Sequence, residues 1–216
     1  MKDNSTETVS IIGGSDGPTS IFIAGRSGKC PLKVRIKNHI YKCKRKRAEK
    51  KIVAGTHTLE AVVAYAMDNY NVIEVNAQQT NYVEQKRSLK ESLILQHKPE
   101  LLGEMKDISN PDFSNEESIR EFFCLLQKRS EMMNEISDSE IPMDFHLYEV
   151  KIGDSSLEIA IDYIWNILGI SYSGSKKEMK QLRRIAQDLY TYYGVSEDDI
   201  REKTERYSSL IAALIS

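Results

Sequence analysis

The strongest chemical signal in the sequence is a run of positive charge over residues 26–51. This segment holds twelve Lys and Arg residues and a single acid, Glu49, so its local charge is +11. The chain of 216 residues has a formal charge of only −2, which leaves −13 on the rest of it. Such an asymmetry is typical of proteins that bind polyanions. The candidate binding residues are Lys33, Arg35, Lys37, Lys44, Arg45, Lys46 and Arg47.

Two kinds of partner fit this charge, a nucleic acid and an acidic protein. Cations fixed along a helix would neutralise several phosphates of a nucleic acid, and Tyr41 would be available to stack on a base. The alternative is a solvated helix face, or one against which the acidic remainder of the same chain lies.

A second candidate site is the loop 13–19, between the apolar stretches Val9–Ile12 and Ile21–Ala24. Its Gly, Ser, Asp and Pro residues favour a tight turn. In such a turn the Asp16 carboxylate, the Thr19 hydroxyl and backbone carbonyls could surround a hard cation, which prefers oxygen ligands. The alternative is that Asp16 and Thr19 only cap the turn and the strand ends. The candidate residues of this loop site are Gly13, Gly14, Asp16 and Thr19.

The segment GGSDGPTSIF, residues 13–22, resembles the DGPT segment in the beta subunit of sodium-pumping decarboxylases of the oxaloacetate type. The aspartate of that segment, implicated in sodium translocation, corresponds to Asp16. The rest of the chain does not match that subunit, whose body is a bundle of membrane helices. No segment here approaches the ~20 apolar residues that a spanning helix needs. The resemblance therefore implies a local turn that could hold a cation, and it does not imply sodium pumping.

Other site classes lack their required spacing. Gly28-Lys29 invites comparison with a phosphate-binding loop, but Ile23 stands where that motif needs glycine and Cys30 where it needs Ser or Thr. The four histidines show no metal-ligand spacing, and the three cysteines form no CxxC pair. We therefore predict no metal, no cofactor and no disulfide framework. With no secretion signal after Met1, the expected location is the cytoplasm.

Hydrophobic spacing predicts the elements that position these residues. Residues 8–25 are expected to form a buried hairpin or strand-loop-strand at the centre of the core. A basic helix over about 32–52 follows, with Ile36, Ile40 and Cys43 on its buried stripe. Alternation at the start of that segment leaves a short strand as the alternative there.

The remaining chain alternates helices with short strands. A short strand is expected at 72–75 and a hairpin from Phe145 to Ile161, turning at Gly153-Asp154. Ser114 and Glu117 predict a capping box for a helix with Ile119, Phe122, Phe123 and Leu126 buried. The other predicted helices are 58–70, 78–97, 175–193 and 197–214, with Gly194 as a C-cap and Ser196 as an N-cap.

The sequence thus predicts an α+β protein, mostly helical, with small antiparallel β-hairpins packed against helices. Residues 1–105 and 114–216 are the expected domains, joined by a linker over 106–113, unless they form one unit. The expected function is that of a soluble, non-catalytic binding or regulatory protein that contacts nucleic acid or an acidic protein through 33–51, without a membrane. The alternative is an enzyme, or a sensor of a small ligand or cation, that uses the GGSDGPT loop.

Overall fold

The computed structural model describes residues 7–11 and 32–216, with the backbone alone for 7–11 and Lys33. The chain forms two compact units, and each is described by itself. The first unit takes its described residues from Met1–Glu74, Leu147–Ile161 and Asn166–Ser216, and the second combines Val75–His146 with Asp162–Trp165.

The predicted α+β class is confirmed, since helices form most of the described chain and the strands pair in antiparallel sheets. The region 106–113, predicted to be a linker, begins at the last residue of a 3₁₀ helix (Pro99–Lys106) and lies within the second unit. The predicted division into domains 1–105 and 114–216 stays a prediction.

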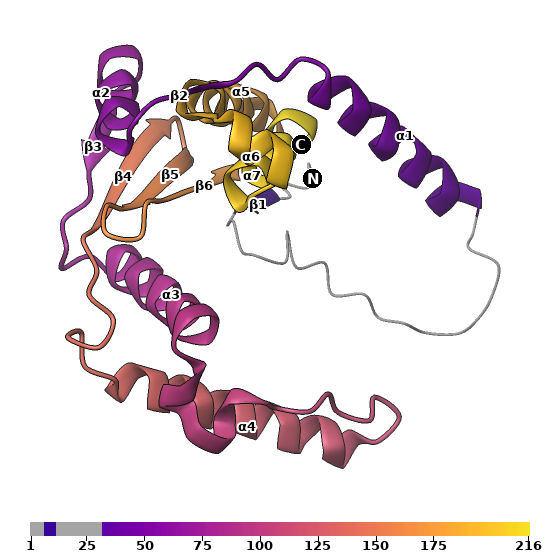
Figure 1. The fold of residues 1–216 in the computed structure, drawn as a ribbon, viewed down its shortest axis with the longest axis vertical. Coiled ribbons are helices and arrows are strands. Elements are labelled where there is room, and N and C mark those ends of the chain that lie inside the picture. Colours follow the sequence, from indigo (N-terminus) through magenta and orange to yellow (C-terminus); the bar gives the residue numbers. More distant parts are fainter. Residues whose placement is uncertain (1–6, 12–31) are drawn as a thin grey trace. The chain divides into compact units, whose positions relative to one another are not determined.

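One five-stranded sheet has the strand order β1-β6-β5-β4-β3 (Figure 1). The predicted hairpin is confirmed as β4 and β5, and Gly153 takes a positive φ of 59° in the turn, where a tight hairpin loop favours glycine. Leu157, Ile159 and Ile161 alternate with half-buried residues and fill the core, as the period of two predicts. The strands are β1 Glu7–Ile11, β3 Val72–Glu74, β4 Phe145–Ile152, β5 Ser155–Asp162 and β6 Ile167–Gly174.

Two parts of this sheet bear on the predictions. The described part of the stretch 8–25 is β1, which pairs with β6. The rest of that stretch lies outside the described residues, so the hairpin expected at the centre of the core stays a prediction. Strand β6 is not predicted from the sequence, because Gly169, Ser171 and Ser173 are typical of loops. In the sheet these small residues alternate with Leu168, Ile170 and Tyr172, which are buried.

The helices of the first unit pack on one another and on the sheet. Thr58 caps the N-terminus of α2 (Leu59–Asn69), since its hydroxyl accepts from the N–H of Ala61 at 3.3 Å. Helix α5 (Lys176–Tyr193) packs against β6, α2 and α7, and buries Leu182, Ala186 and Leu189. Its amphipathic pattern explains why this helix is predicted with nearly correct bounds.

The single helix predicted over 197–214 is two helices, α6 (Glu197–Glu202) and α7 (Glu205–Ile215). Lys203 ends α6, because its backbone takes the left-handed conformation with φ 54°. Its N–H donates to the carbonyl of Asp199. The predicted N-cap is confirmed: Ser196 and Asp199 form a reciprocal capping box.

The end of α5 is a junction of several segments. Gly194, at φ 65°, ends the helix as predicted and begins β7 (Gly194–Val195), which pairs with β2 (Gly55–Thr56). The Arg206 guanidinium donates to the carbonyls of Gly194 (2.8 Å), Tyr193 (2.5 Å) and His57 (3.1 Å). It also lies 3.5 Å from the centre of the Tyr193 ring. One cation thus satisfies backbone oxygens at a helix C-terminus, where positive charge is favoured.

The second unit contains α3 (Thr80–His97), a 3₁₀ helix (Pro99–Lys106) and α4 (Glu116–Glu135). Its buried apolar side chains include Leu93, Ile94, Leu102, Met133, Ile141 and Phe145. The end of α3 at His97 agrees with the predicted helix 78–97.

Two details of α4 differ from prediction. Its N-cap is Asn115 rather than Ser114, and the Asn115 side chain accepts from the N–H of Glu117 at 2.9 Å. The Phe123 side chain, predicted to be buried, is 64% exposed, while Phe122 is half-buried. Periodicity identifies an apolar stripe but not how much of its width a neighbouring element covers.

Trp165 is fixed within the second unit by two contacts. Its ring stacks on His97 with 4.8 Å between ring centroids, and its Nε1 donates to the carbonyl of Pro142 at 2.8 Å. The turn that carries it is held by Asp162, whose Oδ1 accepts from the N–H of Trp165 at 3.0 Å.

Candidate polyanion-binding surface

The basic segment forms the helix α1 (Leu32–Glu49), which confirms the helix predicted over 32–52 and not the strand considered at its start. Only its last turns are packed. Ala48 is 8% exposed, and the end of α1 lies against α7. Lys44 Nζ donates to the carbonyl of Ile215, in the last turn of α7, at 3.3 Å. This anchor fixes one end of α1 in the first unit.

The rest of α1 is exposed, including its apolar residues. Ile36 and Ile40 are each 51% exposed and Cys43 is half-buried, so the prediction that this stripe is buried is wrong. The physical reason is that α7, the described helix that packs on α1, meets it on the side of Lys44 and Ala48, which is not the side of this stripe. Leu32, Ile36, Ile40, Cys43 and Arg47 follow one another at spacings of three or four and therefore share one face.

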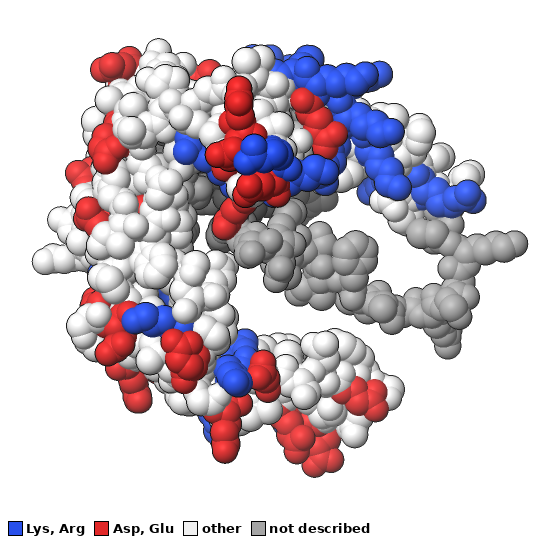
Figure 2. All heavy atoms as spheres, viewed as in Figure 1, with Lys and Arg blue, Asp and Glu red and all other residues white. Residues whose placement is uncertain are grey.

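The predicted cations flank this stripe on both sides. On ideal helical spacing, Arg35, Lys42 and Lys46 lie along one edge, and Lys37 and Lys44 along the other. Figure 2 shows the blue side chains of this helix extending along it. The structure thus brings six of the seven predicted binding residues with described side chains onto one helix; Lys33 belongs to the same helix through its backbone.

Most of these cations have no counter-ion in the described part of the chain. Arg45 is the exception, because its Nε lies 2.9 Å from Glu49 Oε1, and this hydrogen bond raises the pKa of the Arg45 guanidinium. Within residues 32–216, no ion pair or side-chain hydrogen bond engages Arg35, Lys37, Lys46 or Arg47. Because Glu49 is the only acid on α1, the helix cannot neutralise itself.

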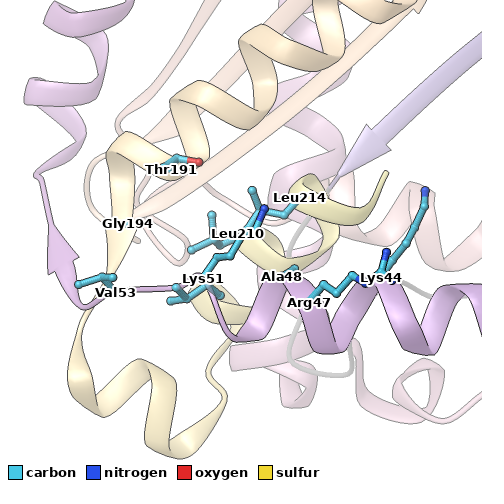
Figure 3. A pocket seen from close by; sticks show the side chains of 10 residues that line it. Lys44, Arg47, Ala48, Lys51, Val53, Thr191, Gly194, Leu210 and Leu214 are labelled. Atoms are coloured by element: carbon cyan, nitrogen blue, oxygen red, sulfur yellow. The ribbon is translucent and has the colours of Figure 1, made fainter.

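A pocket of about 560 Å³ opens beside the anchored end of α1 (Figure 3). Three cations line it, Lys44, Arg47 and Lys51. Its apolar lining comes from Ile52 and Val53, directly after the basic run, and from Leu210 and Leu214 of α7. This pocket is not predicted from the sequence, because its two walls, residues 44–53 and 191–214, are far apart in the chain. The only local signal is the Ile-Val pair that ends the basic run.

A cluster of aromatic rings in the first unit is structural. Tyr192 is stacked between His57 and Tyr65, with ring centroids 3.9 and 4.1 Å apart. The hydroxyls of Tyr65 and Tyr70 both donate to Asp188 Oδ2, at 2.8 and 2.7 Å. The hydrogen bond to Asp188 raises the pKa of Tyr65, and burial together with the same carboxylate raises that of Tyr70. Both phenols therefore stay protonated near neutral pH, and the cluster joins α2 to α5.

The predicted loop site of Gly13, Gly14, Asp16 and Thr19 lies outside the described residues, as does the DGPT resemblance. Both stay predictions. Across residues 7–11 and 32–216, no three His, Cys, Asp or Glu residues are grouped as a metal site would need. The described helices also include none with the length and apolar character required to cross a membrane.

Comparison of the chain with models of protein families, with curated proteins and with solved structures finds no match. The function is therefore inferred from the site itself.

Proposed function

We propose that this is a non-catalytic binding or regulatory protein of the cytoplasm that binds a polyanionic partner through α1. The observation that carries the proposal is the set of exposed cations on α1 that have no counter-ion among the described residues. An ordinary solvated helix places acids three or four residues from its bases, which gains a few tenths of a kcal/mol per pair. Helix α1 has one such pair, Arg45 and Glu49.

Two partner classes fit this surface, a nucleic acid and an acidic protein. Tyr41 is exposed among the cations, which supports stacking on a base. The exposed Ile36 and Ile40 support an acidic protein, because a phosphate backbone gains nothing from apolar side chains.

The test measures binding of two fluorescently labelled probes, an oligonucleotide and a Glu-rich peptide, as the salt concentration is raised. We expect binding of at least one probe at low salt, and affinity that falls steeply with salt as counter-ions are released. The variant to compare replaces Arg35, Lys37, Lys42 and Lys46 by Glu, because these side chains are exposed and make no contact that holds α1 in place. It should abolish binding with the cooperative unfolding transition retained.

The matched control carries the same change of net charge at exposed positions outside α1, with Lys106, Arg120, Lys128 and Lys180 replaced by Glu. This control should bind like the wild type, apart from a small general effect of charge. Absence of binding to both probes at low salt, or equal loss of binding in the two variants, would refute the proposal.

A further inference from the structure

The pocket beside α1 combines two properties that a phosphate-binding surface does not need together. Lys44, Arg47 and Lys51 give it positive charge, while Ile52, Val53, Leu210 and Leu214 give it an apolar wall. Val53 is 83% exposed, so a ligand that covers it would remove apolar surface from water, which is favourable. Figure 3 shows Val53 and Leu210 on the pocket lining together with the long side chain of Lys51.

The pocket also continues the exposed stripe of α1. Arg47 lines the pocket and lies four residues after Cys43 and seven after Ile40, on the same helix face. A ligand that runs along the stripe towards the end of α1 would therefore reach the pocket. Along this path it would meet cations on both sides and apolar side chains between them.

We infer that the pocket receives a large apolar side chain from an acidic segment of a partner protein. This inference rests on the proposed function and chooses between its two partner classes. Carboxylates of the segment would pair with Arg47 and Lys51, which have no counter-ion among the described residues. A Leu, Ile or Phe side chain would cover Val53 and the half-buried Leu214, as anchor residues do at protein interfaces. A nucleic acid offers the negative charge but no aliphatic group for this wall.

The experiment uses the full chain and two labelled peptides that carry the same number of Glu residues. One peptide has Leu at every fourth position, and the other has Ser in place of each Leu. Burial of one Leu side chain is expected to make the Leu peptide bind about tenfold tighter or more. A single-stranded oligonucleotide serves as the third probe.

Variants of the pocket wall test whether the difference in affinity between the Leu and Ser peptides arises in this pocket. Val53→Ser should reduce the preference for the Leu peptide without unfolding the protein, because this side chain is largely exposed. Leu214→Ser, at a half-buried position, should reduce it further. Leu125→Ser, at an exposed position of α4 in the second unit, is the matched control and should leave the preference unchanged.

The outcomes separate this inference from the proposed function. Equal, salt-dependent binding of both peptides would overturn the pocket inference and leave polyanion binding intact. Binding of the oligonucleotide alone would also overturn it, and would assign α1 to nucleic acid. Absence of binding by all three probes at low salt would refute both proposals.

Discussion

Gly194 lies where the end of α5, strand β2 and the Arg206 side chain meet, and its backbone conformation makes this junction possible. Its φ of 65° is one that residues with a Cβ rarely adopt. A Cβ at this position would also overlap the carbonyl oxygen of Gly55 on the paired strand. The sequence predicts the C-cap at this glycine but not the strand pair, because β2 and β7 lie far apart in the chain.

We therefore expect Gly194→Ala to lower the free energy of unfolding by more than about 1 kcal/mol. The measurement is urea denaturation followed by circular dichroism. Gly169→Ala is the control, because its added Cβ would meet the Ala160 Cβ at an ordinary distance of 3.8 Å. Similar losses in the two variants would contradict the role given to the Gly194 backbone.

The tyrosines that share Asp188 predict a loss of stability in alkali. Because the pKa values of Tyr65 and Tyr70 are raised in the folded state, the unfolded chain releases these protons first as the pH rises. The stabilisation is therefore fully present below the ordinary tyrosine pKa of about 10 and decreases above it. Tyr70→Phe should be less stable than the wild type at pH 8 by about 1 kcal/mol, the usual worth of a hydrogen bond.

The difference in free energy of unfolding between the wild type and Tyr70→Phe should narrow above about pH 10, since the phenylalanine variant lacks one ionising group. Urea denaturation from pH 8 to pH 11 measures it. Tyr41→Phe, at an exposed position of α1, is the control and should follow the wild type. A constant difference at every pH would show that Tyr70 is not held in its protonated form.

At the scale of elements, strongly periodic segments are predicted well and segments defined by distant neighbours are not. Helix α5 and the β4–β5 hairpin follow from spacing alone, because each buries one regular face. Strand β6 is missed because its small residues resemble a loop. The stripe of α1 is wrongly predicted to be buried. The sequence shows that its residues are apolar, but it cannot show that no described element lies opposite Ile36 and Ile40.

The exposed stripe predicts an unusual tolerance of polar substitution. The double change of Ile36 and Ile40 to Gln should alter the free energy of unfolding by less than about 1 kcal/mol, since exposed positions contribute little. Leu210→Ala is the comparison and should cost about 2–5 kcal/mol, because that side chain is buried. A loss of similar size in the two variants would show that the stripe of α1 is covered in solution.

At the scale of the whole molecule, residues 75–146 of the second unit interrupt the first unit in sequence. The two ends of this insertion meet in the sheet, because Glu74 on β3 pairs with Tyr148 on β4. Such paired ends can be joined by a short turn. The division of the chain at this point is invisible in the sequence, since no change of composition marks it.

We predict that replacing residues 76–145 by a short Gly- and Asn-rich turn leaves a folded first unit. Its far-ultraviolet circular dichroism should show helix and strand, with one cooperative unfolding transition. The shortened chain should also keep salt-dependent binding to whichever probe, oligonucleotide or Glu-rich peptide, the full chain binds. The reason is that α1, α5 and α7 all belong to the first unit. Loss of cooperative unfolding would show that the first unit requires the inserted residues.

The contacts of Trp165 give the protein a built-in optical reporter. Trp165 is the only tryptophan of the chain, and both its stacking on His97 and its hydrogen bond to Pro142 lie within the second unit. Its fluorescence emission therefore records the state of that unit, whereas tyrosine absorbance is dominated by the rings of the first unit.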